Sequence, residues 1–569
     1  MRRLLIVLVA CTACTDHVQL GKNGIPGLSA IEVSPGDTTY DITDLLTPPQ
    51  SIPFIAIGVF DNGMRRDVTK EVAWSVDNPA PGNFLEPGNY LTSGTAAGHV
   101  LVHATAGEIV GEARLTVTIS ATIVDSAFPP PPGAGALFGS MPVTDPMRSP
   151  QILYPAAETM FPQGIARMLF QFARGTGNDA FRLGFDSDVL HLAVLTGTDR
   201  WQPDDLVWKL ITQSHPDASV VLSLQAAAST MPGTVYGGAP ETLDVAKAPE
   251  LDETLLYFWS AATSGVMRGQ LAATGAGKLY PGDSTCVGCH AVSRSGAAMA
   301  MGYGGEVLQT IDTDMLGTEV SATQNLPMGW ATYSPDGTLV LVADKGVLTL
   351  RNATTGMPVG PMMGKVPLMS QATHPDWSPD GTTIAVALAA SSVTNQEVKN
   401  ASIATIPYNN GRWGTPRVIV AAAGGADNNY FPKWSPDGKF IAYVNANDGS
   451  HGAASAELRL IAAEGGVPLR LRVASHRLGG IDDVPDLADT MPAWAPAATA
   501  NGVSWLAFAS NRPYGVVRPM LGSSQIWIAA VYTTHAGDPS FAAFWLPCQD
   551  ITDLANNPVW ALPPSINPG

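Results

Sequence analysis

The chain has 569 residues, which is enough for about three or four domains of ordinary size. Charged residues make up 14% of it, well below the roughly 25% of an average soluble protein, and it contains 57 glycines and 46 prolines. The net charge of −18 argues against nucleic acid as a partner and against electrostatic docking on an anionic membrane. Low charge and many turn-forming residues favour short strands joined by turns, so we expect a mainly β protein.

The first residues form a short export signal. Two arginines precede a brief apolar run that is too short to cross a bilayer, as in a signal peptide. Residues 8–11, Leu-Val-Ala-Cys, resemble a bacterial lipobox, and Cys14 follows two small residues in the same way. The resemblance implies a lipoprotein signal peptide over residues 1–14, acylation of Cys11 or Cys14, and a place in the bacterial cell envelope. There it would be an outer-membrane lipoprotein facing the periplasm or the cell surface. An ordinary secretory signal is the alternative.

Residues 28–120 alternate apolar and polar side chains, which predicts strands. Asp67-Val68-Thr69 and Trp74-Ser75 in this stretch resemble the bacterial Ig-like domain family. That resemblance implies a sandwich with Trp74 between its sheets. It also implies a spacer or adhesive role and no chemistry.

Residues 121–149 are rich in proline and glycine and are predicted to form a linker. Residues 150–275 contain strand-like runs, among them 205–211, and are similar in spacing to an Ig or fibronectin type III sandwich. Trp208, Tyr257 and Trp259 are the expected core residues of this second β-sandwich.

An internal repeat begins near residue 290. Three copies carry Ser-Pro-Asp-Gly, at 334–337, 378–381 and 435–438, before an alternating apolar strand. Proline presets φ and Asp-Gly tolerates a tight turn, so each copy predicts a hairpin. The anchors that align across all copies are Val292, Tyr333, Trp377, Trp434, Trp494 and Trp560. The series resembles the TolB-type (WD40-like) β-propeller repeat, which implies a propeller over 280–569 with five or six blades. A strand near the last anchor would close the ring.

One motif points to chemistry: Cys286 and Cys289 are three residues apart and His290 follows, which is the attachment pattern of c-type cytochromes. The two thiols would form thioethers to haem c, with His290 as proximal iron ligand. Candidate distal ligands are Met299 or Met301, with Met328 and His374 as alternatives. The competing interpretation is a structural CxxC disulfide. Cys548 is expected to be a lone buried thiol.

These observations predict an exported, lipid-anchored envelope protein that carries one covalent haem c on a propeller and transfers electrons. It would meet a redox partner or envelope protein through the propeller loops and touch the membrane only by its anchor. The alternative is a non-enzymatic binding scaffold that recognises protein or glycan. The sequence has no hydrolase or zinc motif, so it favours a non-enzymatic role, with a haem enzyme such as a peroxidase as a third hypothesis.

Overall fold

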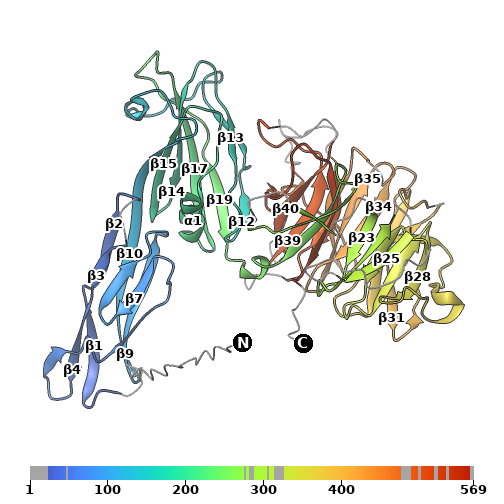
Figure 1. The fold of residues 1–569 in the computed structure, drawn as a ribbon, viewed down its shortest axis with the longest axis horizontal. Coiled ribbons are helices and arrows are strands. Elements are labelled where there is room, and N and C mark those ends of the chain that lie inside the picture. Colours follow the sequence, from blue (N-terminus) through green and yellow to red (C-terminus); the bar gives the residue numbers. More distant parts are fainter. Residues whose placement is uncertain are drawn as a thin grey trace, which may run out of the picture. The chain divides into compact units, whose positions relative to one another are not determined.

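The computed structural model describes residues 24–45, 49–273, 277–280, 287–303, 307–312, 326–391, 393–450, 452–475, 488–497, 502–517, 523–533 and 537–563. Cys11, Cys14 and Cys286 lie outside these ranges. The described residues are mostly strands, as the composition predicts (Figure 1). The chain divides into two compact units: residues 1–121 with 188–192 and 209–214, and residues 122–187, 193–208 and 215–569.

The first unit consists of short sheets. One has the order β1 (Leu28–Ser34), β4 (Ile55–Phe60), β5 (Arg65–Asp67); another has β3 (Ser51–Pro53), β8 (Asn89–Thr92), β7 (Gly82–Glu86). β6 (Ala73–Val76) pairs with β9 (Gly98–Ala106), β9 pairs with β10 (Ile109–Val124), and β2 (Thr38–Ile42) runs parallel to β10. Every strand predicted in this region is therefore present. The Ig-like family stays a prediction.

Trp74 anchors the aromatic part of this unit. Its indole is half-buried, packs 4.9 Å from the ring of Phe84, and donates a hydrogen bond to the Thr69 carbonyl at 2.9 Å. It also packs against a cluster of buried side chains that includes Ala56 and Val68. The expectation that Trp74 contributes to the core is confirmed.

The second unit begins with a further β region. One sheet has the order β11 (Gln151–Tyr154), β13 (Phe170–Ala173), β16 (Arg200–Trp201). The other has β12 (Thr159–Pro162), β19 (Glu241–Ala246), β17 (Ala218–Ala227), β14 (Ala180–Asp186), β15 (Leu190–Thr196), and β18 (Tyr236–Gly237) pairs with β17. Short 3-10 turns lie at η1 (Ala134–Phe138) and η2 (Pro249–Leu251).

Residues 205–211 are not a strand, contrary to the sequence prediction. They belong to helix α1 (Asp205–Gln213), whose first turn is capped by the Asp204 carboxylate accepting the Val207 N–H at 2.8 Å. Its apolar side chains at 207, 208, 210 and 211 recur at helical spacing and are buried, whereas Leu206 is exposed. Trp208 is buried as expected, and its indole N–H bonds the Ile165 carbonyl at 2.8 Å.

The rest of the second unit is a β-propeller, which confirms the fold expected from the repeat. The described residues form six blade sheets around one centre (Figure 1). In chain order, five of them are β23 (Val287–Val292), β24 (Ala298–Tyr303), β25 (Val307–Asp312); β26 (Trp330–Tyr333), β27 (Leu339–Asp344), β28 (Val347–Asn352); β29 (Gln371–Trp377), β30 (Thr383–Ala389), β31 (Ala401–Asn409), β32 (Arg412–Trp413), β33 (Arg417–Val420); β34 (Asn428–Trp434), β35 (Phe440–Ala446), β36 (Glu457–Ala462), β37 (Leu469–Arg470); and β38 (Asp489–Trp494), β39 (Val503–Ser510), β40 (Gln525–Tyr532), β41 (Phe544–Trp545). A 3-10 turn, η3 (Pro361–Gly364), follows β28.

The sixth blade closes the ring with strands from both ends of the propeller. Its innermost strand is β42 (Ala555–Ala561), which pairs with β20 (Leu255–Ser260), followed by β21 (Gly265–Gly269) and β22 (Lys278–Tyr280). The predicted boundary near 275–280 is therefore too late, because residues from 255 onward already belong to the propeller. Tyr257 is fully buried, but in this blade and not in a sandwich.

The Ser-Pro-Asp-Gly copies form the predicted tight turns. In each, the serine hydroxyl bonds the aspartate carboxylate at 2.5–2.6 Å and accepts the N–H of the next strand at 3.0 Å. The glycines have φ of +71° to +76°, a conformation that favours glycine over other residues. These turns place the prolines that follow each serine at the rim of the central channel.

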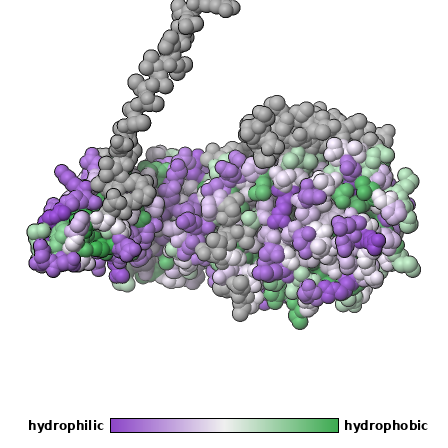
Figure 2. Space-filling view, turned by 90° about the horizontal axis from the view of Figure 1, so that it is seen from below, coloured by the Kyte–Doolittle hydropathy of each residue, from purple (hydrophilic) through white to green (hydrophobic). Residues whose placement is uncertain are grey.

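On the face seen in Figure 2, hydrophilic and hydrophobic residues are interspersed in small groups. In the part of the chain that the structure describes, no helix is long and apolar enough to cross a membrane.

Candidate functional site

The central channel is lined by the innermost strand of every blade. These strands are β23, β26, β29, β34, β38 and β42, and they enclose a cavity of about 170 Å³. Aromatic anchors of the repeat line it, among them Trp377, Trp494 and Trp560, together with the turn prolines. The lining thus combines apolar walls with polar and charged groups, and concave sites of this kind bind small molecules.

The same backbone conformation recurs at the channel in four consecutive blades. His374, Phe431, Met491 and Asn557 each have φ of +50° to +53° and each precedes a proline. In all four of these strands the pairing register shifts at this point, as in a β-bulge. The bulge turns side chains toward the channel, and the rings of His374 and Phe431 lie 3.9 Å apart between their centroids.

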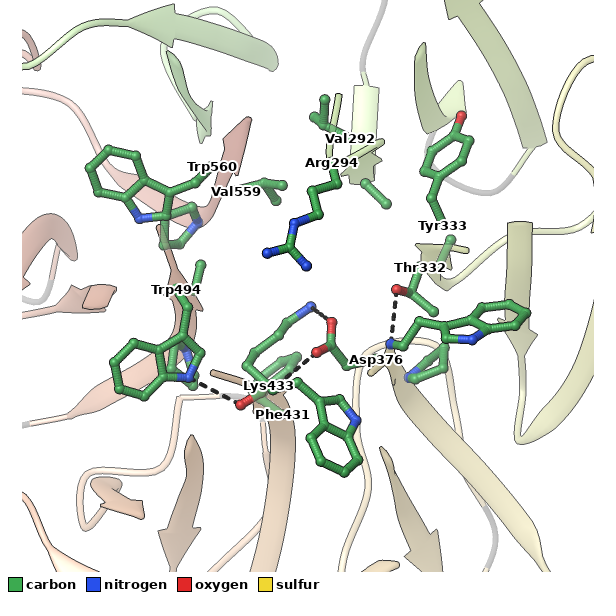
Figure 3. Close-up of a pocket in the computed structure, with 18 of the residues that line it drawn as sticks. Val292, Arg294, Thr332, Tyr333, Asp376, Phe431, Lys433, Trp494, Val559 and Trp560 are labelled. Atoms are coloured by element: carbon green, nitrogen blue, oxygen red, sulfur yellow. Dashed lines mark hydrogen bonds and ion pairs between the residues drawn. The ribbon is translucent and has the colours of Figure 1, made fainter. Parts of the chain in front are cut away.

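Three charged side chains meet inside this cavity (Figure 3). The ammonium of Lys433 lies 3.1 Å from the carboxylate of Asp376, whose other oxygen accepts the Trp434 N–H at 2.8 Å. The guanidinium of Arg294 faces this pair and donates to the Pro496 carbonyl at 2.8 Å. Burial raises the pKa of Asp376, and Lys433 opposes that shift. The cavity thus holds two cations and one carboxylate.

Two buried histidines line the same cavity. Burial lowers the pKa of His290 to about 4 and lowers that of His374 well below its ordinary value. Nδ1 of His290 lies 3.2 Å from the Asn557 amide nitrogen. Within the described residues, Nε2 of His290 and Nδ1 of His374 are buried and make no hydrogen bond of normal geometry. Both rings are therefore neutral at pH 7, and the backbone of Gly288 and of Tyr257 interacts with the His290 ring and opposes the lowering of its pKa.

The structure brings only part of the sequence-predicted haem site to the channel. His290 lies in β23 and lines the cavity, and Cys289 beside it is a free, half-buried thiol whose pKa burial raises to about 12. Cys286 lies outside the described residues. No group of three or more His, Cys, Asp or Glu side chains in the described ranges is arranged to hold a metal ion.

The candidate distal ligands lie in different surroundings. Met299 and Met301 are fully buried in a cluster with Tyr257 and Val266, between the first blade and the closing blade. Met328 is buried between the first two blades of the repeat. Of the four candidates, only His374 lines the channel together with His290. Nε2 of His290 makes no hydrogen bond of normal geometry and is the atom that a haem iron would take, whereas the three methionines already serve as core residues.

Sequence reasoning missed Arg294, Asp376 and Lys433. Arg294 occupies the turn position at which Pro335 and its equivalents stand in other copies of the repeat. Asp376 and Lys433 directly precede the aromatic anchors of their blades, where other copies have Thr332, Ala493 and Val559. The signal was therefore present as charged departures from an otherwise uncharged repeat position.

Comparison with known proteins gives a structural likeness only. No family model and no curated protein matches the chain. Among solved structures, it is similar to a putative TolB from Agrobacterium tumefaciens (14% identity, 53% of this chain and 97% of that chain, TM-score 0.28). TolB from Acinetobacter baumannii is similar at 12% identity, over 60% and 79% of the two chains, with a TM-score of 0.35. Hydrazine synthase from Kuenenia stuttgartiensis is similar at 15% identity, over 52% and 74%, with a TM-score of 0.29. At this level of similarity, none of them bears on the function of this chain.

Proposed function

We propose that the propeller is a non-enzymatic binding module that takes a ligand, or the end of one, into its central channel. The observation that carries this proposal is the group formed by Arg294, Asp376 and Lys433 inside a cavity whose lining includes five tryptophans and seven prolines. The side chains of Lys433 and Asp376 are only 30% and 16% exposed. Removing charges from water is costly, and an ion pair that is largely removed from water seldom stabilises a fold by itself. A functional reason for keeping these charges is therefore needed.

The fold does not require a charge at this position. Thr332 performs the same blade-to-blade task as Asp376, since its hydroxyl accepts the N–H of Trp377 at 3.3 Å as Asp376 accepts that of Trp434. A neutral side chain therefore suffices to connect neighbouring blades. The charges of Asp376 and Lys433 are additional, and ligand recognition is the role that the cavity around them supports.

A channel-blocking variant tests this proposal. Ala493 lines the channel and is buried, so Ala493→Trp should fill the cavity. A thermal-shift screen with small organic acids, amines and sugars should find compounds that stabilise the wild-type chain and leave the blocked variant unchanged. Ala422→Trp, outside the channel lining, is the matched control. Stabilisation that persists in Ala493→Trp, or no stabilising compound at all, would contradict the proposal.

A second candidate is the electron-transfer protein with one covalent haem c, anchored in the cell envelope through Cys11 or Cys14. It is supported by the Cys286–Cys289–His290 spacing and by Nε2 of His290, which makes no hydrogen bond of normal geometry. Haem bound here would supply one-electron chemistry, with His290 as axial ligand and Cys286 and Cys289 as attachment points.

Mass spectrometry of protein expressed with a haem-maturation system tests both the lipid and the haem. The second candidate predicts the mass of one haem, an absorption band near 550 nm, and loss of both in a Cys286→Ala/Cys289→Ala variant. A haem-free wild-type chain with a Cys286–Cys289 disulfide would eliminate this candidate and leave the binding module.

A further inference from the structure

We propose that the channel ligand is a small monocarboxylate with an apolar, ring-sized body, bound through Arg294. This inference rests on the binding module proposed above and specifies the chemistry of its ligand. Charge, hydrogen-bonding capacity and size each support it independently.

The charge of the channel lining favours an anionic ligand. Arg294 and Lys433 are cationic, Asp376 is the carboxylate that pairs with Lys433, and His290 and His374 are neutral because burial lowers the pKa of each. The lining therefore carries one excess positive charge inside a chain whose net charge is −18. A local positive site enclosed by low-dielectric walls attracts anions over cations.

The hydrogen-bond donors of Arg294 also favour a carboxylate. A guanidinium has five N–H groups in a planar fork that matches a carboxylate, and Arg294 gives one bond to the Pro496 carbonyl. An acceptor ligand in the cavity can bind the remaining N–H groups of this guanidinium, and a cation cannot.

The size and the aromatic lining of the cavity suit a small ligand with an apolar body. A cavity of about 170 Å³ is close to the engineered 150 Å³ cavity that holds benzene, and below the ~300 Å³ at which drug-sized pockets begin. Trp377, Trp494 and Trp560 supply aromatic walls. Together these features favour a compact aromatic or aliphatic acid and exclude the full body of an oligosaccharide or a nucleotide.

Asp376 should limit the affinity of such a ligand. Its carboxylate lies across the cavity from Arg294 and repels a second carboxylate (Figure 3). Asn in its place keeps an oxygen for the Trp434 N–H and removes the negative charge. An anionic ligand should therefore bind more tightly to Asp376→Asn, and a cationic ligand less tightly.

The experiment uses benzoate as probe, with benzamide and benzylamine as neutral and cationic counterparts, titrated calorimetrically into the mature chain. We expect binding of benzoate and much weaker binding of the other two. Arg294→Met should weaken benzoate about ten- to hundredfold, the range expected for loss of a charge-assisted hydrogen bond. Asp376→Asn should tighten it about fivefold or more. Arg417→Met, on an exposed arginine paired with Glu464, is the control and should change nothing.

Several outcomes overturn the inference. They are benzylamine binding better than benzoate, unchanged benzoate affinity in Arg294→Met, and weaker benzoate binding in Asp376→Asn. If screened compounds of another class bind the channel and are blocked by Ala493→Trp, the carboxylate inference fails while the binding module stands. If Arg294→Met does not fold, Arg294→Lys replaces it, and unchanged benzoate affinity there again contradicts bidentate recognition.

Discussion

The carboxylate of Asp376 contacts two groups of the next blade at once, the ammonium of Lys433 at 3.1 Å and the backbone N–H of Trp434 at 2.8 Å. One blade earlier, Thr332 makes only the backbone bond, to the N–H of Trp377. The inter-blade hydrogen bond thus occurs at two successive junctions, and the ion pair is an addition at the second of them.

We expect Asp376→Thr to lower the free energy of unfolding by about 1–3 kcal/mol. The new hydroxyl can take over the bond to the Trp434 N–H, but Lys433 is left in a largely enclosed channel without its counter-ion. Adding Lys433→Met should recover at least half of the loss. Urea unfolding of both variants provides the measurement, and Glu397→Gln, in an exposed pair with Lys399, should change stability by less than about 1 kcal/mol. A double variant less stable than the single one would contradict this account.

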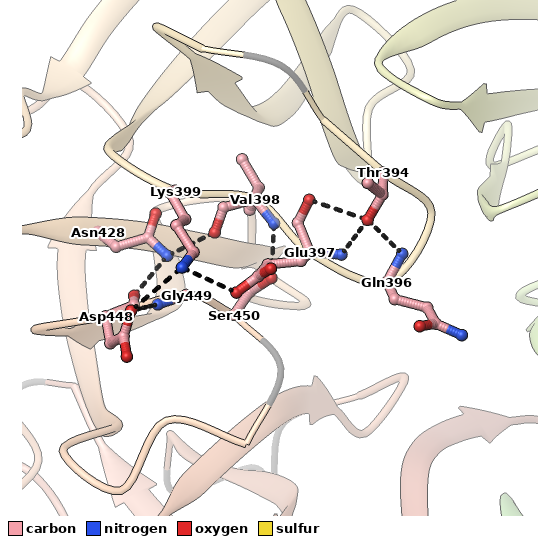
Figure 4. A network of polar contacts seen from close by, with 9 residues as sticks. All are labelled: Thr394, Gln396, Glu397, Val398, Lys399, Asn428, Asp448, Gly449 and Ser450. Carbon is pink, nitrogen blue, oxygen red and sulfur yellow. Dashed lines mark hydrogen bonds and ion pairs between the residues drawn. The ribbon is translucent and has the colours of Figure 1, made fainter.

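The same junction between blades is also held by neutral groups, farther along β34 (Figure 4). The side chain of Asn428 is buried, donates to the carbonyls of Val398 and Asp448 at 2.8 and 2.9 Å, and accepts the Ala401 N–H at 3.0 Å. Asn428→Ala leaves these backbone groups without partners. The free energy of unfolding should then be about 2–4 kcal/mol lower than in the wild type.

Lys399→Met in the same network is the control for Asn428→Ala. Lys399 bridges Glu397 and Asp448 at 3.4 and 3.5 Å, and its side chain is more than half exposed. Surface ion pairs of this kind contribute about 0–1 kcal/mol. Equal losses of stability in the two variants would mean that burial of Asn428 is not what matters.

The fold was predictable where it depends on local repetition. The Ser-Pro-Asp-Gly turns and the aromatic anchors recur in the sequence, so the inner strands could be placed without a structure. The closing pair, β20 with β42, could not, because nothing in Leu255–Ser260 identifies a partner about three hundred residues away. Helix α1 could have been predicted from the Asp204 cap and the helical spacing of its apolar residues. It was missed because the neighbouring segments are strands.

The candidate site was predictable only in part. Cys289 and His290 stand out as a motif, and His290 does line the channel. Arg294, Asp376 and Lys433 come from three blades, and each resembles an ordinary surface charge when read alone. Their meeting depends on the number of blades and on ring closure, which local patterns do not determine.

Replacing a turn glycine should lower the stability of the fold where its φ is in the left-handed region, and should change it little elsewhere. Gly381 has φ of +76°, a region that costs other residues about 1–2 kcal/mol, so Gly381→Ala should lower stability by that amount. Gly425→Ala is the matched control, because an added Cβ meets nothing within 4 Å and its φ is not in the left-handed region. Thermal unfolding of the two variants compares them directly, and equal melting temperatures would refute the argument.

The last prediction concerns the pH dependence that His290 gives to stability. Its pKa is lowered by burial to about 4, below the ordinary value of 6.5, so the unfolded chain binds the proton more readily between these values. The contribution of the neutral ring is fully present above about pH 6.5 and is lost as the pH falls toward 4. The expected loss in that window is up to about 3 kcal/mol, from the size of the shift.

His290→Gln isolates this effect, because other titrating groups cancel in the difference between the variant and the wild type. We expect the stability difference between the two proteins to shrink as the pH is lowered from 7 to 4. Parallel curves would show that the ring is not buried in its neutral form.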